Sequence, residues 1–201
     1  MEDLCVTFER WHMGDGTYPP LRKGQKVNLA FCVQSYEMEF TNVPQYVFRQ
    51  LKNSDYEFSG QIVRDFQIGV LRLLLVNVKE FFFYIKISES GLQNLEGQFL
   101  CGKGQLLIDY GIWSEYFCHY EKEIDIFYNF TVESIHEVAI PDKFIQIDDG
   151  VFSAPPSLLA NDYDATDMKE IEDMEYSTND VSFFLLDLKS TNEKVARTFQ
   201  K

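Results

Sequence analysis

Apolar and polar residues alternate along several stretches of the chain, and this two-residue period predicts β-strands. In the first stretch, Leu4, Val6 and Phe8 alternate with Cys5, Thr7 and Glu9. Residues 27–33 and 124–132 show the same alternation over longer runs. We therefore expect each of these strands to bury one face and to expose the other.

Residues 70–76 and 81–87 are apolar on both faces, which is typical of strands near the centre of a sheet. The polar break at 77–80 predicts a hairpin, residues 58–66 supply a strand just before it, and a final strand is expected at 181–188. Because these strands follow one another closely without long helical intervals, the sequence predicts a mainly β fold, an antiparallel, meander-like barrel or sandwich.

Two or three short helices are expected beside the strands, one of them at the C-terminus, and four segments are candidates. One follows Pro44 over residues 45–52, and a second is suggested by aromatic residues at helical spacing over 113–120. Another opens at Asp167 to Glu170. The residues from Ser190 to Glu193 have the form of a capping box, in which each end residue satisfies the other's backbone amide, and they predict a helix at the C-terminus.

The chain has 201 residues, of which 45% are hydrophobic, so it can bury a sizeable core. We expect a β-rich core domain over residues 1–145. Residues 146–201 should form an acidic crossover, a final strand and the C-terminal helix, packed on the same domain. No apolar run approaches the roughly 20 residues that span a bilayer. The acidic start is unlike a secretory signal, and the spacing of the cysteines favours free thiols. A cytoplasmic protein is therefore expected.

Acidic residues dominate the charge, with 32 Asp and Glu against 18 Lys and Arg and a net charge of −14. Residues 142–180 hold eleven acids and two lysines, so this segment alone carries 2 − 11 = −9. Such a surface repels nucleic acids and anionic membranes, because binding to phosphates needs clustered Lys and Arg. It favours a cationic partner, or it simply keeps the protein soluble.

The sequence contains no convincing catalytic motif. The stretch GQFLCGKG at residues 97–104 follows the phosphate-loop pattern until its last position, where Gly104 replaces the Ser or Thr that ligates Mg²⁺. We interpret it as glycines between strands. Asp109 and His119 are the better candidates for acid–base chemistry, since Asp109 lies in an apolar run where burial would raise its pKa. Alternatively, Asp109 points outward or caps a helix. No cofactor or metal site is predicted.

The first functional hypothesis is a non-catalytic acidic binding protein, such as an immunity protein or inhibitor that neutralises a basic toxin. The proposed partner-binding residues are Trp11, Tyr18, Asp162, Tyr163, Asp164, Asp167, Glu170, Glu172, Asp173, Glu175 and Tyr176. The acids would steer the partner and the aromatic residues would anchor it. Alternatively, Trp11 and Tyr18 close the end of the barrel.

Two other hypotheses remain open. The second is a small-ligand-binding or hydrolytic β-barrel with a pocket near Asp109. The third is a subunit of a larger protein assembly, which would also explain the surplus of aromatic residues.

Overall fold

The computed structural model describes residues 3–68, 71–79, 81–87, 94–109, 111, 118–119, 122–139, 146–148, 151–153, 168–175 and 182–198. The elements, in chain order, are β1 (Leu4–Glu9), α1 (Trp11–Gly14), β2 (Lys26–Leu29), β3 (Phe31–Thr41), β4 (Val47–Lys52), β5 (Asp55–Ile68), β6 (Leu71–Asn77), β7 (Phe82–Ile87), β8 (Phe99–Ile108), β9 (Tyr128–Ala139), β10 (Gln146–Asp148), β11 (Val151–Ser153), β12 (Met168–Ile171) and β13 (Ser182–Ser190). The predicted mainly β architecture with a barrel is confirmed.

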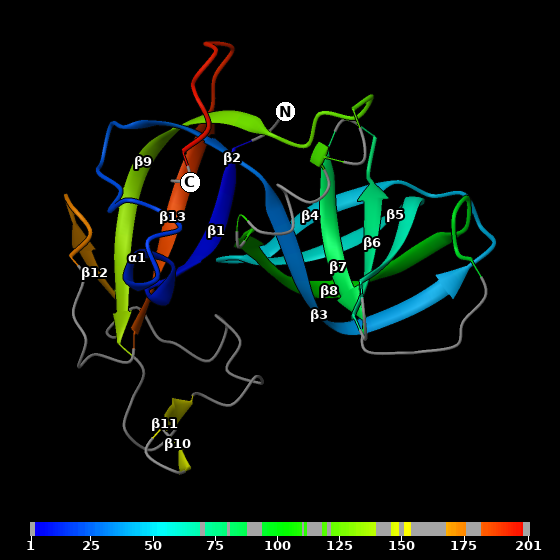
Figure 1. Cartoon of the computed structure of the whole chain (residues 1–201), viewed down its shortest axis with the longest axis horizontal. Coiled ribbons are helices and arrows are strands. Elements are labelled where there is room, and N and C mark those ends of the chain that lie inside the picture. Colours follow the sequence, from blue (N-terminus) through cyan, green and yellow to red (C-terminus); the bar gives the residue numbers. More distant parts are fainter. Residues whose placement is uncertain are drawn as a thin grey trace.

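Five strands close into a barrel in the order β3, β7, β6, β5 and β8, with β8 pairing back to β3. The closure depends on a parallel pairing, in which Cys32 and Val33 of β3 lie beside Tyr84 and Ile85 of β7. The other pairings around the barrel are antiparallel. Strand β4 continues the sheet beyond β5. We call β3 to β8 the barrel lobe (Figure 1). The expected meander order holds only for β4, β5, β6 and β7.

The remaining long strands form the sheet lobe, defined as β1, β2, β9, β12 and β13 together with α1 (Figure 1). Strand β13 lies between β1 and β9 and is antiparallel to both. On its other side, β9 pairs with β2 along one half and with β12 along the other. A single parallel bridge, from Thr7 of β1 to Leu107 of β8, joins this sheet to the barrel.

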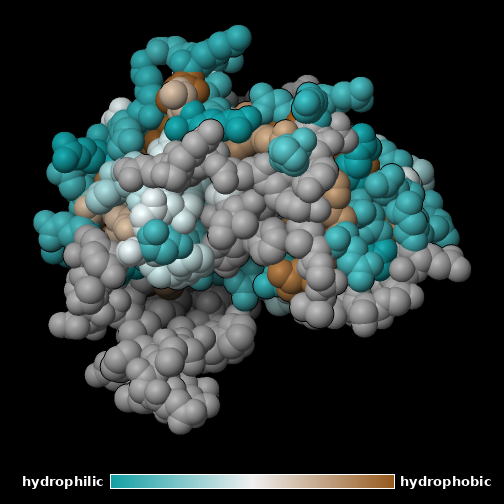
Figure 2. Space-filling model, in the orientation of Figure 1, coloured by the Kyte–Doolittle hydropathy of each residue, from teal (hydrophilic) through white to brown (hydrophobic). Residues whose placement is uncertain are grey.

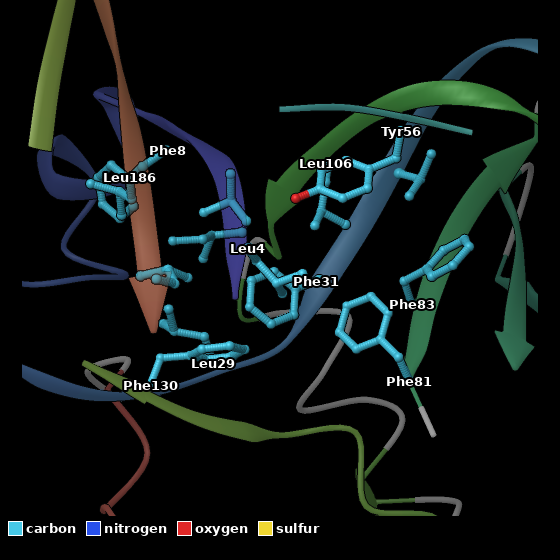
Figure 3. Packing of buried hydrophobic residues seen from close by; sticks show 14 of the residues in the cluster. Leu4, Phe8, Leu29, Phe31, Tyr56, Phe81, Phe83, Leu106, Phe130 and Leu186 are labelled. Atoms are coloured by element: carbon cyan, nitrogen blue, oxygen red, sulfur yellow. The ribbon is translucent and has the colours of Figure 1, made fainter. Parts of the chain in front are cut away.

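One continuous hydrophobic core runs through both lobes. Phe31 stands where they meet (Figure 3). Its ring lies 5.6 Å from Phe130 of the sheet lobe and 5.6 Å from Phe81 of the barrel lobe. Because all three rings are buried, the lobes share apolar surface that neither could bury alone.

The glycines of the GQFLCGKG stretch allow close packing inside the barrel wall. Gly97 lies in the turn before β8 and has φ at +85°. Glycine adopts this backbone conformation without strain. Gly102 lies inside β8, where a Cβ atom would stand 2.1 Å from the carbonyl oxygen of Glu37 on β3. The stretch is therefore a turn followed by a strand, and no helix follows it to bind a phosphate.

The expectation of short helices over 45–52 and 167–170 was wrong. Val47 to Lys52 form β4, which pairs with β5, and Met168 to Ile171 form β12, which pairs with β9. In both places, hydrogen bonds to a neighbouring strand override a weak local preference. The predicted helix over 113–120 lies largely outside the described residues.

The predicted C-terminal helix is also absent over the described residues 191–198. Ser190 still belongs to β13, so the capping box does not form. The N–H of Glu193 donates to Thr191 Oγ1 instead. Farther along, the N–H of Val195 donates to Asn129 Oδ1, and that of Thr198 to the Asn28 carbonyl oxygen. These bonds hold the segment against β2 and β9 and replace the bonds of a helix.

No helix in the part of the chain that the structure describes has the length and apolar character needed to cross a membrane.

Candidate functional site

Asp109 follows the end of β8 and is fully buried, so its side chain does not face solvent. Its backbone N–H donates to the Ala30 carbonyl oxygen at 2.9 Å, and its carbonyl oxygen accepts a hydrogen bond from the Tyr18 hydroxyl at 2.9 Å. A pocket of about 240 Å³ lies beside it, and its lining includes Cys32, Tyr84, Lys86 and Asp109.

This pocket lies on the outer face of the barrel. Along β3 and β7, Val33 and Ile85 belong to the main core, whereas Cys32 and Tyr84 belong to a separate cluster. Because side chains alternate along a strand, the second pair points away from the barrel interior. The structure does not bring the two predicted acid–base residues together here, since His119 is exposed and does not line the pocket.

The hydroxyl and thiol groups around Asp109 stay protonated. Burial, followed by the nearby charge of Asp109, raises the pKa of Tyr18, Tyr84 and Cys32 well above their ordinary values. A reactive thiol needs the opposite shift, because the thiolate is the nucleophile. The pocket can therefore donate hydrogen bonds to a ligand, but it holds no activated cysteine.

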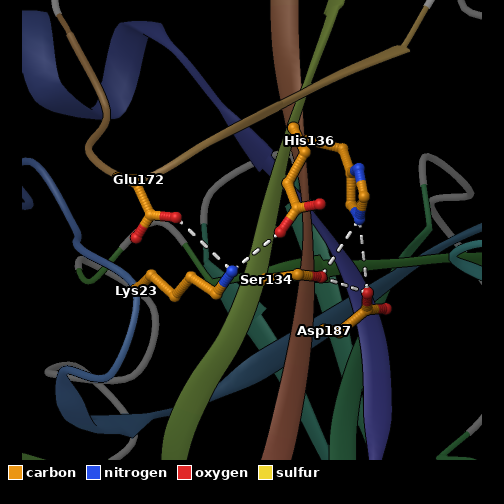
Figure 4. Close-up of polar contacts among 6 residues, drawn as sticks. Lys23, Ser134, His136, Glu172 and Asp187 are labelled. Carbon is orange, nitrogen blue, oxygen red and sulfur yellow. Dashed lines mark hydrogen bonds and ion pairs between the residues drawn. The ribbon is translucent and has the colours of Figure 1, made fainter.

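Ser134, His136 and Asp187 form a polar cluster on the sheet lobe (Figure 4). Ser134 and His136 are two residues apart on β9, and Ser134 lies opposite Asp187 of β13. His136 Nε2 is 3.1 Å from Ser134 Oγ and 3.5 Å from Asp187 Oδ2. Ser134 Oγ also donates to Asp187. In a catalytic triad, the acid and the serine bind opposite ring nitrogens. Here both contact Nε2, so the cluster is not a triad.

The cluster continues across the sheet to Cys5 of β1, which lies opposite Asp187. Burial, the charge of Asp187 and a hydrogen bond to Asp187 all raise the pKa of the Cys5 thiol. The Cys5 thiol is therefore not an activated nucleophile. Sequence reasoning missed Ser134 and Asp187. The Ser-x-His spacing on a clear strand signals a shared face, but the pairing of β9 with β13 cannot be read from it.

The predicted steering acids that the structure describes are largely paired within the chain. Lys23 Nζ lies 2.8 Å from Glu170 and 3.5 Å from Glu172 (Figure 4), and Arg22 Nε lies 3.4 Å from Asp173. The hydrogen bond and the charge of Lys23 lower the pKa of Glu170. The other members of the set lie outside the described residues, except for exposed Glu175. Those outside are Asp162, Tyr163, Asp164, Asp167 and Tyr176.

The two described aromatic anchors differ sharply in exposure. Trp11 of α1 is 48% exposed, with its ring 4.2 Å from that of His12. Tyr18 is 1% exposed and packs against Phe8 and His12. Tyr18 therefore belongs to the core, and only Trp11 presents a ring to solvent.

Exposed apolar residues gather elsewhere, in the barrel lobe. The described residues include six large hydrophobic ones that are exposed, and five of them fall within residues 36–51, namely Tyr36, Phe40, Val43, Tyr46 and Leu51. In the face of the molecule that Figure 2 shows, hydrophilic residues predominate and apolar residues appear in small separate groups. Contiguous patches of exposed apolar side chains are typical of binding surfaces, so this segment is a candidate for one.

No protein-family model, curated protein or solved structure matches the chain. Within the described ranges, no three His, Cys, Asp or Glu side chains are grouped so that they could hold a metal ion. The function therefore has to be inferred from the residues and surfaces of this protein alone.

Proposed function

We propose that the protein is a non-catalytic acidic binding protein that captures a basic protein partner, such as an immunity protein or inhibitor that neutralises a toxin. The supporting observation is the charge surplus. If each of the 18 Lys and Arg residues paired with one carboxylate, 32 − 18 = 14 acids would still lack a cationic partner. Internal ion pairs such as Lys23–Glu170 therefore cannot remove the net charge of −14.

Such a surplus acts at long range. The summed field of the acids draws a cationic protein towards the surface and speeds the encounter, more so at low salt. We assign this steering to the acids of residues 162–175, among which Glu175 is exposed. Trp11, whose ring is exposed in the sheet lobe, is the proposed aromatic contact for the same partner. Inhibition would follow from covering the partner's active site, which needs no catalytic residue.

The test is partner capture at low and high salt. The purified protein is titrated with a basic ribonuclease and with an acidic protein of similar size, and binding is followed by surface plasmon resonance. We expect binding to the basic protein only, weakened by salt. Replacing the acids of residues 162–175 by Asn and Gln should slow association severalfold. Unchanged capture at low salt would show that these acids do not guide docking.

A control variant carries the same number of substitutions at acids outside this segment, and thermal unfolding verifies that each variant folds. A pull-down from the native host, or a toxin-like basic product of the neighbouring gene, would identify the physiological partner.

A second candidate function is binding of a small ligand in the pocket beside Asp109. The observation that favours it is the pocket of about 240 Å³, which places a buried carboxylate near Lys86 and the Tyr84 hydroxyl. A thermal-shift screen of small polar molecules tests it. A compound that stabilises the wild-type protein but not an Asp109→Asn variant would support the pocket, and a screen without any such compound would count against it.

A further inference from the structure

A groove of about 820 Å³ crosses the outer face of the barrel lobe over β3, β8, β5 and β4. The strand register places side chains across it in rows. Glu39, Cys101, Ser59 and Val47 form one row, and a row of alternating charge lies beside it. That second row is Glu37, Lys103, Glu57 and Arg49. We call this surface the barrel groove.

Two ion pairs use most of the charge in the barrel groove. Lys103 Nζ lies 2.7 Å from Glu37, and Arg49 pairs with Glu57. Glu39 is different, because no hydrogen bond or ion pair joins its side chain to any residue that the structure describes. The barrel groove therefore holds one exposed carboxylate that is free to receive a cation.

Aromatic rings lie beside this carboxylate. Cys101 is directly opposite Glu39, so Phe99, two residues earlier on β8, is the diagonal neighbour of Glu39. The ring of Phe99 lies 5.4 Å from that of Tyr46, edge to face, and Tyr46 is 37% exposed. Phe99 is half-buried, and both rings lie at the border of the groove rather than in its lining. A carboxylate near such rings suits an Arg or Lys side chain, whose charge binds the acid while its planar group or aliphatic stem covers the rings.

The surroundings favour a protein partner. The segment of residues 36–51 supplies half of the lining of the barrel groove, and the same segment carries most of the large exposed apolar side chains among the described residues. Among the described strands, β4 ends the sheet order, so its outer edge borders no further strand. Apolar residues around a charged centre are typical of protein interfaces, where aromatic and Arg contacts carry much of the affinity.

We propose that the barrel groove is the docking site of the basic partner, which places an Arg or Lys side chain between Glu39 and the rings of Phe99 and Tyr46. This inference rests on the proposed function, and it assigns association and dissociation of the partner to two different surfaces. The acids of residues 162–175 govern how fast the partner arrives. The barrel groove governs how long it stays, because close contacts change dissociation more than association.

Cys101 provides a reporter, because it lies in the barrel groove and is partly exposed. In a Cys32→Ser, Cys118→Ser background, the thiols left are Cys101 and the buried Cys5. An oligoarginine peptide serves as the probe, with a neutral peptide of equal length as its control. Bound oligoarginine should slow alkylation of Cys101 severalfold at low salt, and the neutral peptide should not.

Affinity for the same probe is then compared among variants. Glu39→Gln combined with Tyr46→Ala should weaken binding about tenfold. Glu39→Asp, which keeps the charge, should retain more binding than Glu39→Gln. Glu175→Gln, which removes one exposed charge from the sheet lobe, should weaken binding about twofold or less. Thermal unfolding confirms that the variants remain folded.

The two proposals fail in different ways. If oligoarginine binds but Cys101 is not protected, or if Glu175→Gln weakens binding more than Glu39→Gln with Tyr46→Ala, the barrel groove is not the docking site and the proposed function survives. If neither oligoarginine nor the basic ribonuclease binds at low salt, the proposed function itself is wrong.

Discussion

The sheet lobe and the barrel lobe are built from the same alternating strands, but they treat their surfaces differently. Both lobes pair acids with bases of their own across neighbouring segments, as in Lys23–Glu170 of the sheet lobe and Lys103–Glu37 of the barrel lobe. The lobes differ in that, among the described residues, most of the large exposed apolar side chains fall within residues 36–51 of the barrel lobe. The alternation that specifies the fold is therefore separate from the surface features that we assign to partner binding.

The lobes also differ in the ionisable groups that they bury. The barrel lobe buries a complete ion pair, since the side chains of Arg72 and Asp65 are 9% and 6% exposed. The sheet lobe buries His12 as a neutral ring. Mutations in the two lobes should consequently produce different pH profiles, although the shared core predicts that both lobes unfold together.

The largest effect is expected from Gly102→Ala in the barrel wall. The new methyl group would stand 2.1 Å from a backbone oxygen of β3, so the two strands must separate. We expect a loss of about 4 kcal/mol or more in the free energy of unfolding, measured by urea denaturation. The control is Gly16→Ala, which meets no atom within 4 Å but has φ at +79° and should cost about 1 kcal/mol.

The same variant tests whether the lobes unfold together. Fluorescence of Trp11, followed in a Trp113→Phe background, reports on the sheet lobe. With Gly102→Ala, its transition should move together with the one followed by circular dichroism. A sheet-lobe transition that stays at the wild-type position would show that the lobes are independent.

Breaking the buried ion pair should have the next largest effect. Arg72→Met leaves Asp65 buried without its cation, and we expect a loss of about 3 kcal/mol at neutral pH. The matched control, Arg49→Met, breaks an exposed pair, with Arg49 68% exposed, and should cost about 0.5 kcal/mol. If the two variants lost the same free energy of unfolding, burial would not be what makes the Arg72–Asp65 pair important for stability.

The Asp65 pair also has a pH signature. Burial alone would raise the pKa of Asp65. Hydrogen bonds from Arg72 and from the Leu95 amide, together with the charge of Arg72, outweigh burial and hold the pKa below its ordinary value of 3.8. The unfolded chain therefore takes up the proton first as the pH falls. The stabilisation is present above pH 3.8 and is lost as the pH falls through the lower pKa of the folded state. Arg72→Met should remove this loss.

The smallest of the three effects concerns His12. Burial, partly offset by the charge of Asp15, lowers the pKa of His12 from 6.5 to about 4. Between these values the unfolded chain binds a proton that the folded protein does not, so stability is full above pH 6.5 and falls as the pH drops. We expect the wild type to lose about 2 kcal/mol between pH 7 and pH 5 through this residue. His12→Phe should remove that part of the slope, and an unchanged slope would show that His12 does not cause it.

The strands could be predicted because their pattern is local. Alternation over 27–33 and the doubly apolar runs at 70–76 and 81–87 mark positions that must be buried whichever strand lies alongside. The hairpin from Leu71 to Ile87 followed directly from the break between them. The path of the barrel was not predictable, because its closure depends on a parallel pairing between β3 and β7, which are far apart in the sequence.

The predicted helices that did not form show where contacts with other strands override local sequence signals. Ser190 to Glu193 matches a capping box, but Ser190 pairs with Phe130 and Asn129 holds the following residues. The candidate site was predictable only in part, since Asp109 does lie beside a pocket and Trp11 is exposed. Sequence analysis did not identify Glu39. It stands out only because the neighbouring acids Glu37 and Glu57 form ion pairs and Glu39, within the described residues, does not, and these pairs depend on the strand register.

The placement of β13 has a consequence for how the protein is made. All five strands of the barrel lie within residues 31–108, so all of them are synthesised before β9 and β13 of the sheet lobe. Strand β1 is translated before the barrel, yet one of its edges stays without its full partner until residues 182–190 emerge. During that interval the nascent chain exposes the edge of β1, and a chaperone that binds extended segments would find it there.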